Sequence, residues 1–250
     1  MPRFFINLAY RGAPFHGWQT QPRDVSVQQT LEKALAVVMR CPVPVTGAGR
    51  TDAGVNARRM IAHFDLPGEL GDKNRVISAL NSLLGCDIAV YDIVKVHDEA
   101  HARFDAVART YHYYAAERKS PFFSHLSWKA PKGLDYEAMN EAASLLLTVE
   151  DFTSFSKLHT DVTTNICNVT EASWRDCEFG GKVFVITADR FLRNMVRAVV
   201  GTLVDVGRGK LTTDGFRRII EARDRCAAGT SMPGHALYLW DVRYPYISFD

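Results

Sequence analysis

Strand-like and helix-like stretches follow one another in a similar order twice along this chain. Strands are expected where apolar residues alternate, and helices where they recur every three or four positions. Ser26-Val27-Gln28-Gln29 resembles a capping box that opens the first helix. In the first half the order strand, helix, strand, strand, helix, strand is predicted over 3–10, 27–39, 43–46, 60–66, 72–84 and 87–96.

The second half broadly repeats this order. Strands are predicted over 109–117, 167–178, 182–189 and 237–242, and helices over 135–148, 191–206 and 214–222. We therefore predict an α+β fold of two ferredoxin-like (β-α-β-β-α-β) halves, fused into one continuous antiparallel-type sheet with helices on one side. The strand pattern breaks near 98–108, so the expected halves are 1–105 and 106–250.

The composition excludes several classes of protein. Hydrophobic residues make up 47% of the chain and charged residues 23%, as in ordinary globular proteins. No apolar run approaches the roughly 20 residues that cross a bilayer, and the N-terminus lacks a signal-peptide pattern. The five cysteines form no C-x-x-C pair, which argues against a disulfide framework or a thiolate zinc site. We expect a cytoplasmic protein with no membrane association.

Positive charge is concentrated in one part of the chain. The formal net charge is only +2, yet residues 190–225 hold nine basic side chains against four acidic ones. A nucleic-acid backbone is a suitable ligand for such a stretch. A solvated helix face is an equally good explanation of the charge alone.

The loop Gly49-Arg50-Thr51-Asp52-Ala53-Gly54-Val55 is the sharpest candidate for chemistry. Gly49 and Gly54 allow backbone conformations closed to other residues, so the loop can project Arg50 and Asp52 in fixed directions. A carboxylate beside an arginine stays ionised, which suits a nucleophile. The alternative is a structural Asx-turn, in which Asp52 only caps backbone amides.

A tyrosine-rich strand, Arg109-Thr110-Tyr111-His112-Tyr113-Tyr114, is a second candidate. Alternate residues of a strand share a face, so Tyr111 and Tyr113 point the same way. Such rings stack on unpaired bases, although aromatic cross-strand pairs in a half-buried strand are the commoner use.

The third candidate is the predicted helix over 191–206. Arg193 and Arg197 stand four residues apart and are expected on one face, while apolar residues crowd the other faces. An arginine on so apolar a helix needs an anionic partner. Asp52 is a natural candidate for that partner.

These features together resemble the tRNA pseudouridine synthase A family. The loop at 49–55 is similar to the signature loop of that family, and further blocks agree in order across residues 6–243. Those blocks include Tyr10-Arg11-Gly12, Phe15-His16-Gly17-Trp18-Gln19-Thr20-Gln21, His101-Ala102-Arg103-Phe104-Asp105-Ala106, Asp151-Phe152-Thr153-Ser154-Phe155 and Val206-Gly207-Arg208-Gly209-Lys210.

The resemblance implies a role for each candidate residue. Asp52 would be the nucleophile, and Arg50 would help displace the target base. Tyr111 would stack on the uracil and assist proton removal from C5. Arg197 would pair with Asp52, and Arg193 would bind substrate. It also implies a cofactor-independent isomerase that forms a homodimer, flips its target nucleotide and modifies uridines in the tRNA anticodon arm, usually positions thirty-eight to forty. Whether Asp52 attacks C1′, attacks C6 or abstracts a sugar proton stays open.

Two departures from the family pattern bear on substrate choice. Asn56 stands where histidine is frequent, and Ser231-Met232-Pro233-Gly234-His235 replaces a more usual Ala-Pro run. Two rival functions fit the sequence less well. A catalytically inactive RNA-binding protein of the same fold should have lost Asp52 or Arg197, and both are present. A P-loop phosphotransferase needs G-x-x-x-x-G-K-[ST], whereas Leu211 follows Lys210.

Overall fold

The computed structural model describes residues 1–157, 164–178 and 180–249. Contacts divide the chain into two compact units, Met1–Val107 with Leu239–Asp250, and Ala108–Tyr238. The halves expected from the sequence are 1–105 and 106–250. The contacts differ from the expected halves in one respect, since the C-terminal segment from Leu239 onward belongs with the first unit.

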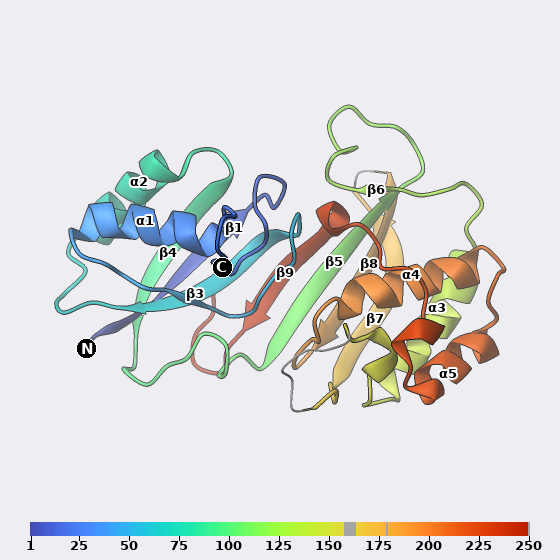
Figure 1. Ribbon diagram of the computed structural model, residues 1–250. Coiled ribbons are helices and arrows are strands. Elements are labelled where there is room, and N and C mark those ends of the chain that lie inside the picture. Colours follow the sequence, from blue (N-terminus) through green and yellow to red (C-terminus); the bar gives the residue numbers. More distant parts are fainter. Residues whose placement is uncertain (158–163, 179, 250) are drawn as a thin grey trace. The chain divides into compact units, whose positions relative to one another are not determined.

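The first unit is an antiparallel sheet with two helices. Its elements are β1 (Arg3–Tyr10), α1 (Val27–Met39), β2 (Thr46–Gly47), β3 (Asn56–Asp65), α2 (Lys73–Leu84) and β4 (Ile88–Val96), joined by the later part of β9 (Leu237–Arg243). The strand order is β4-β1-β3-β9, and β2 pairs with β3. Both helices lie on one face of these strands (Figure 1).

Local sequence signals account for much of this unit. The Ser26 side chain caps α1 by accepting a hydrogen bond from the Gln29 amide at 3.2 Å, as the capping box predicts. Asp72 caps α2 in the same way. The inner strand β1 is buried along most of its length, because β3 and β4 flank it on both sides. The apolar residues of β1, β3 and α1 thus form the core of the unit.

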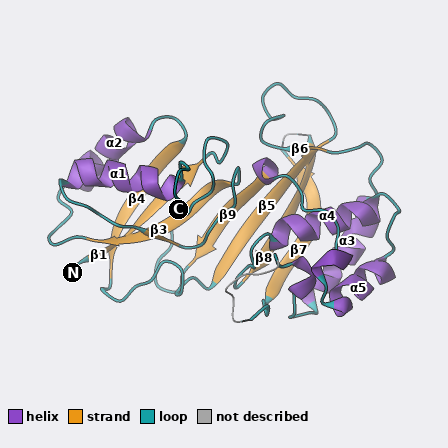
Figure 2. Cartoon of the chain, viewed as in Figure 1, coloured by secondary structure: helices purple, strands orange, loops and turns teal. Residues whose placement is uncertain are grey.

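The second unit also combines antiparallel strands with helices (Figure 2). Its elements are β5 (Ala108–Ala116), β6 (Trp128–Lys129), α3 (Tyr136–Ser144), β7 (Val169–Cys177), β8 (Gly181–Ala188), α4 (Met195–Gly207) and α5 (Thr213–Ala222). The strand order is β5-β8-β7, with the short β6 parallel to β5. Helices α3, α4 and α5 gather on one face of the strands (Figure 1).

The α+β fold class is confirmed, and most predicted elements are present. Two helices differ from their expected bounds. The helix predicted over 135–148 ends at Ser144, and a 3-10 turn over Leu145–Leu147 follows it. The helix predicted from 191 begins only at Met195, because Asn194 takes the left-handed conformation with φ 67°. Among the described residues, no helix is long and apolar enough to cross a membrane.

Candidate active site

The signature loop lies between β2 and β3 of the first unit. Thr51 and Val55 are buried and anchor the loop, whereas Arg50 is exposed and Asp52 half-buried. The Val55 amide donates to the Asp52 carbonyl at 3.1 Å. Gly54 closes this turn with φ +75°, as its position in the motif predicted. Gly49 does not have a positive φ.

The segment that follows β1 packs against the back of this loop. A Cβ on Gly12 would stand 2.2 Å from the carbonyl oxygen of Val55, and one on Gly17 would stand 2.5 Å from that of Thr51. Only glycine permits such close approach of two backbones. The Trp18 amide donates to the Thr51 carbonyl at 3.2 Å. The position of Asp52 is therefore fixed by a segment some forty residues earlier.

Two buried side-chain hydrogen bonds reinforce the same contact. The hydroxyls of Tyr10 and Thr51 are 2.8 Å apart. Asn56 Oδ1 accepts from the Gly12 amide at 2.8 Å, and the Asn56 residue is only 3% exposed. Asn56, which departs from the family pattern, therefore helps to hold the loop in place.

The second unit carries Tyr111 on β5. Its ring meets Phe191 edge-on, with centroids 5.0 Å apart, and its side chain is half-buried. This contact fixes one edge of the ring. Tyr113 points to the same side, as predicted, but it is completely buried, and its hydroxyl has no hydrogen-bond partner. Burial raises the pKa of Tyr113, and the positive charge of Arg197 opposes that rise.

Arg197 lies in the first turns of α4 and is held by a strap that we define as residues 228–233. Its Nε donates to the Met232 carbonyl, and the Met232 amide donates back to the Arg197 carbonyl at 3.0 Å. The strap runs tight against α4, because a Cβ on Gly201 would stand 1.9 Å from the Thr230 carbonyl oxygen. The Gly229 amide donates to Thr202 Oγ1 at 2.9 Å.

Arg225 fastens this strap from the other side. Its Nη2 donates to Ser231 Oγ at 2.8 Å, and its Nη1 donates to the carbonyls of Gly229 at 3.2 Å and Ala228 at 3.4 Å. Asn194 Nδ2 donates to the same Ser231 hydroxyl at 2.6 Å. The departure at residues 231–235 therefore falls on the segment that orients Arg197.

Arg193 differs from its predicted position. It precedes α4, so it does not share a helix face with Arg197, and that expectation was wrong. The reason is the left-handed Asn194, which turns the chain just before the helix begins. Arg193 is exposed, and its carbonyl accepts a hydrogen bond from the Lys157 amide at 3.0 Å.

The predicted site residues fall into two groups. Arg50 and Asp52 belong to the first unit, and Tyr111, Arg193 and Arg197 belong to the second. The ion pair between Asp52 and Arg197 remains a prediction. Within the described part of the chain, no three His, Cys, Asp or Glu side chains are grouped to hold a metal ion.

Sequence reasoning missed the residues that support these groups, chiefly Gly12, Gly17, Asn56, Ser231 and Arg225. Gly12 and Gly17 stand in two of the sequence blocks that resemble the family. Their place in those blocks is the one sequence feature that could have marked them as important. Their function depends on contacts with residues far along the chain, so the spacing within each block did not disclose it.

Comparison with known proteins defines the class first. A family model described as tRNA pseudouridine synthase matches residues 142–245, which include α4 and the strap. Pseudouridine synthases are isomerases, so this match identifies an RNA-modifying isomerase.

Full-length relatives then identify the family. The chain is 61% identical over 245 residues to tRNA pseudouridine synthase A of Parabacteroides distasonis, covering 98% of this chain and 97% of that protein. It is 58% identical to the protein of the same name from Porphyromonas gingivalis, covering 98% of each. It is 41% identical to that of Bacillus subtilis, covering 97% of this chain and 99% of that one. The chain belongs to the tRNA pseudouridine synthase A family, as the resemblance predicted.

Proposed function

We propose that this protein converts uridine to pseudouridine in the anticodon stem-loop of tRNA, at positions thirty-eight to forty, with Asp52 as the nucleophile. The observation that carries the proposal is the half-buried carboxylate on a loop whose backbone is held by Gly12, Gly17 and Trp18. A group fixed in this way is prepared for reaction without reorganisation.

The reaction is an isomerisation, so its atoms balance within the nucleotide. The bond between N1 and C1′ breaks, the uracil rotates, and a bond forms between C5 and C1′. The proton on C5 leaves for solvent, and N1, which bears no proton in uridine, takes one up from solvent, so the product is an isomer of the substrate. The target nucleotide must leave its stack before this can happen.

Each site residue takes a role in this proposal. The exposed Arg50 occupies the space that the displaced base vacates. Tyr111, braced by Phe191, stacks on the flipped uracil. Arg197 pairs with Asp52, and its guanidinium is oriented by Met232. Arg193, exposed just before α4, contacts the phosphate backbone.

The family also supports two proposals about the working enzyme. We propose that it acts as a homodimer, and that it works in the cytoplasm, where its tRNA substrates are found. Sedimentation of the protein at micromolar concentration tests the first of these.

The deciding experiment is tritium release from tRNA labelled at C5 of uridine. The wild type should release tritium, and Asp52→Asn should release none while keeping its affinity for tRNA. If neither protein releases tritium from any tRNA, the enzyme assignment fails, and a catalytically inactive RNA-binding protein of the same fold becomes the better description.

A second variant separates Arg197 from a simple phosphate contact. Arg197→Ala should lose far more in turnover than in tRNA affinity, because its partner is Asp52. Arg218→Ala, an exposed position on α5, is the matched control and should affect turnover little. Equal losses of turnover and affinity in Arg197→Ala would show that Arg197 binds phosphate instead.

A further inference from the structure

A segment between β5 and α3 forms a protruding turn that the proposed reaction does not use (Figure 1). We define the Phe122 turn as residues 118–127. Among the described residues, Phe122 is the most exposed large apolar side chain, at 79%. Single exposed apolar residues are common on protein surfaces, so this exposure alone carries no conclusion.

Hydrogen bonds within the Phe122 turn hold its backbone in place. Ser120 Oγ accepts from the amides of Phe122 and Phe123, each at 3.3 Å. The Leu126 amide donates to the Phe123 carbonyl at 3.0 Å. Such a serine turn sets the direction of the backbone at Phe122. The aromatic side chain is therefore directed outward by the local hydrogen bonds.

The base of the turn is tied to the rest of the second unit. Tyr238 Oη donates to the Leu126 carbonyl at 2.9 Å, and Ser127 Oγ donates to the Phe123 carbonyl at 2.8 Å. The pairing of β6 with β5 follows directly, between Ala115 and Trp128. The ring is thus presented from a fixed support, which lowers the entropy cost of binding a partner.

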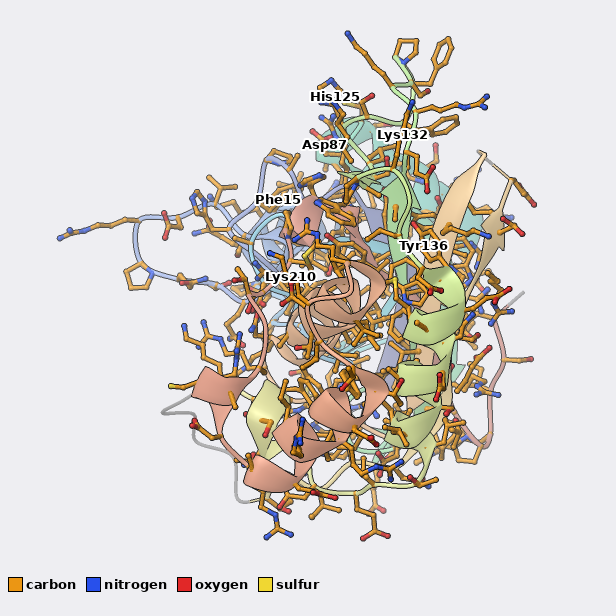
Figure 3. The ribbon with its side chains drawn as sticks, turned by 90° about the vertical axis from the view of Figure 1, so that its right-hand side faces the viewer. Phe15, Asp87, His125, Lys132, Tyr136 and Lys210 are labelled. Carbon is orange, nitrogen blue, oxygen red and sulfur yellow. The ribbon has the colours of Figure 1, made fainter. Side chains whose placement is uncertain are left out.

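The charge around Phe122 indicates what kind of partner fits. The whole chain is nearly balanced, with 30 basic and 28 acidic residues. Residues 118–134 instead hold four basic side chains and no acidic one. All four are exposed. The basic residues are Arg118, Lys119, Lys129 and Lys132. Figure 3 labels His125 and Lys132 on this segment.

Phe104, the other very exposed phenylalanine, is a useful contrast. Its ring is covered within its own unit by His101, with centroids 4.2 Å apart, and by the Arg103 guanidinium at 5.6 Å. Phe122 has no such ring or cation contact from the described residues. Its face is available to an external ring.

We propose that the Phe122 turn is an RNA-binding surface, on which the Phe122 ring stacks against an unpaired nucleotide of tRNA outside the reacting position. Aromatic stacking within a cationic patch is how proteins bind unpaired nucleotides. A second copy of this chain is a poorer partner, because two patches of like charge would repel one another. The proposal rests on tRNA as the substrate and adds a second contact to it.

Tritium release and filter binding with labelled tRNA test this proposal in the full-length protein. Phe122→Ala should weaken tRNA binding about 5- to 150-fold, the range of one lost stacking contact. Its single-turnover rate at saturating tRNA should stay at the wild-type value. Phe122→Trp should bind at least as tightly as the wild type. Tyr91→Ala removes a ring that is 60% exposed on β4 and should leave binding unchanged.

The charge component is tested separately. Replacing both Arg118 and Lys119 with glutamine should reduce the magnitude of the slope of log affinity against log salt by roughly 1.4 to 1.8. An unchanged slope would overturn the electrostatic part of the proposal.

Photocrosslinking identifies the partner directly. With p-benzoylphenylalanine in place of Phe122, we expect crosslinks to labelled tRNA. Crosslinks to a second protomer, together with wild-type tRNA affinity for Phe122→Ala, would overturn the proposal and assign the turn to self-association. The failure of the proposed function has a different signature, since the wild type would then release no tritium.

Discussion

Arg197 and Met232 are joined by two hydrogen bonds, one from the guanidinium Nε to the Met232 carbonyl and one from the Met232 amide back to the Arg197 carbonyl. The strap that contains Met232 is fastened in turn by Arg225 through Ser231. Three residues, the farthest of them thirty-five positions from Arg197 in sequence, therefore set the direction of its guanidinium.

Loss of Arg225 should therefore slow the reaction without weakening substrate binding. We expect Arg225→Gln to lower kcat about 10- to 100-fold with KM nearly unchanged, because Arg197 loses its fixed orientation. Single-turnover kinetics and tRNA binding measure the two quantities. Arg217→Gln, an exposed arginine of α5, is the control. A loss confined to tRNA affinity would show that Arg225 contacts RNA.

The glycines behind the signature loop should not tolerate a side chain. Gly12→Ala should destabilise the protein by about 1–3 kcal/mol or more, because the new Cβ meets the Val55 carbonyl, which is backbone and cannot move aside. Gly49→Ala is the matched control, since a Cβ there has no neighbour within 4 Å. Thermal unfolding measures both. Equal melting temperatures for the two variants would contradict the close approach.

Asn56 should matter for stability. Asn56→Ala leaves the buried Gly12 amide without its acceptor, and we expect a loss of about 1–3 kcal/mol in the free energy of unfolding. Urea titration measures this loss. The set of tRNAs that the variant modifies should match that of the wild type. A changed set with unaltered stability would instead place Asn56 in substrate recognition.

Tyr111 offers a test of whether its hydroxyl takes part in the chemistry. Tyr111→Phe keeps the ring that meets Phe191. We expect tRNA binding to persist while tritium release from C5 is lost. Full activity in this variant would limit Tyr111 to stacking.

His63 should make the protein less stable in mild acid. It is buried, its Nδ1 accepts from the Ala102 amide at 3.1 Å, and burial lowers its pKa to about 4. Because an unfolded histidine titrates near 6.5, the unfolded chain binds a proton between these two values and the folded chain does not. The stabilisation is therefore complete above pH 6.5 and declines as pH falls toward 4.

His63→Asn is the variant that isolates this effect. Its side-chain oxygen replaces the acceptor but does not titrate. Urea midpoints at pH 7.0, 5.5 and 4.5 should fall more steeply for the wild type than for the variant. Parallel curves for both proteins would contradict the assignment to His63.

The sequence predicted those parts of the fold that depend on neighbouring residues. The Ser26 cap and the alternation in β1 are local signals, and each is present as expected. The strand predicted over 43–46 was less accurate, because β2 occupies only Thr46–Gly47. Val43 and Val45 are buried by packing. The alternation of apolar and other residues over 43–46 therefore arose without pairing to a neighbouring strand.

The supports of the site could not be predicted in the same way. The left-handed Asn194 delays α4, and the apolar pattern that continues through Leu192 concealed this. The contacts of Gly12 with Val55, and of Arg197 with Met232, join segments that are distant in sequence. Such contacts depend on the folded chain, and periodicity carries no information about them.

The return of the chain from Leu239 to the first unit has a consequence for biosynthesis. Arg59 of β3 pairs with Asp241 of β9 at 2.8 Å, and Tyr244 packs on Phe5 of β1 with ring centroids 5.1 Å apart. These partners are translated on the order of ten seconds after Val107. While the ribosome works, the contiguous second unit can complete its core, whereas the N-terminal unit must wait, with part of its apolar surface uncovered, until the last residues emerge.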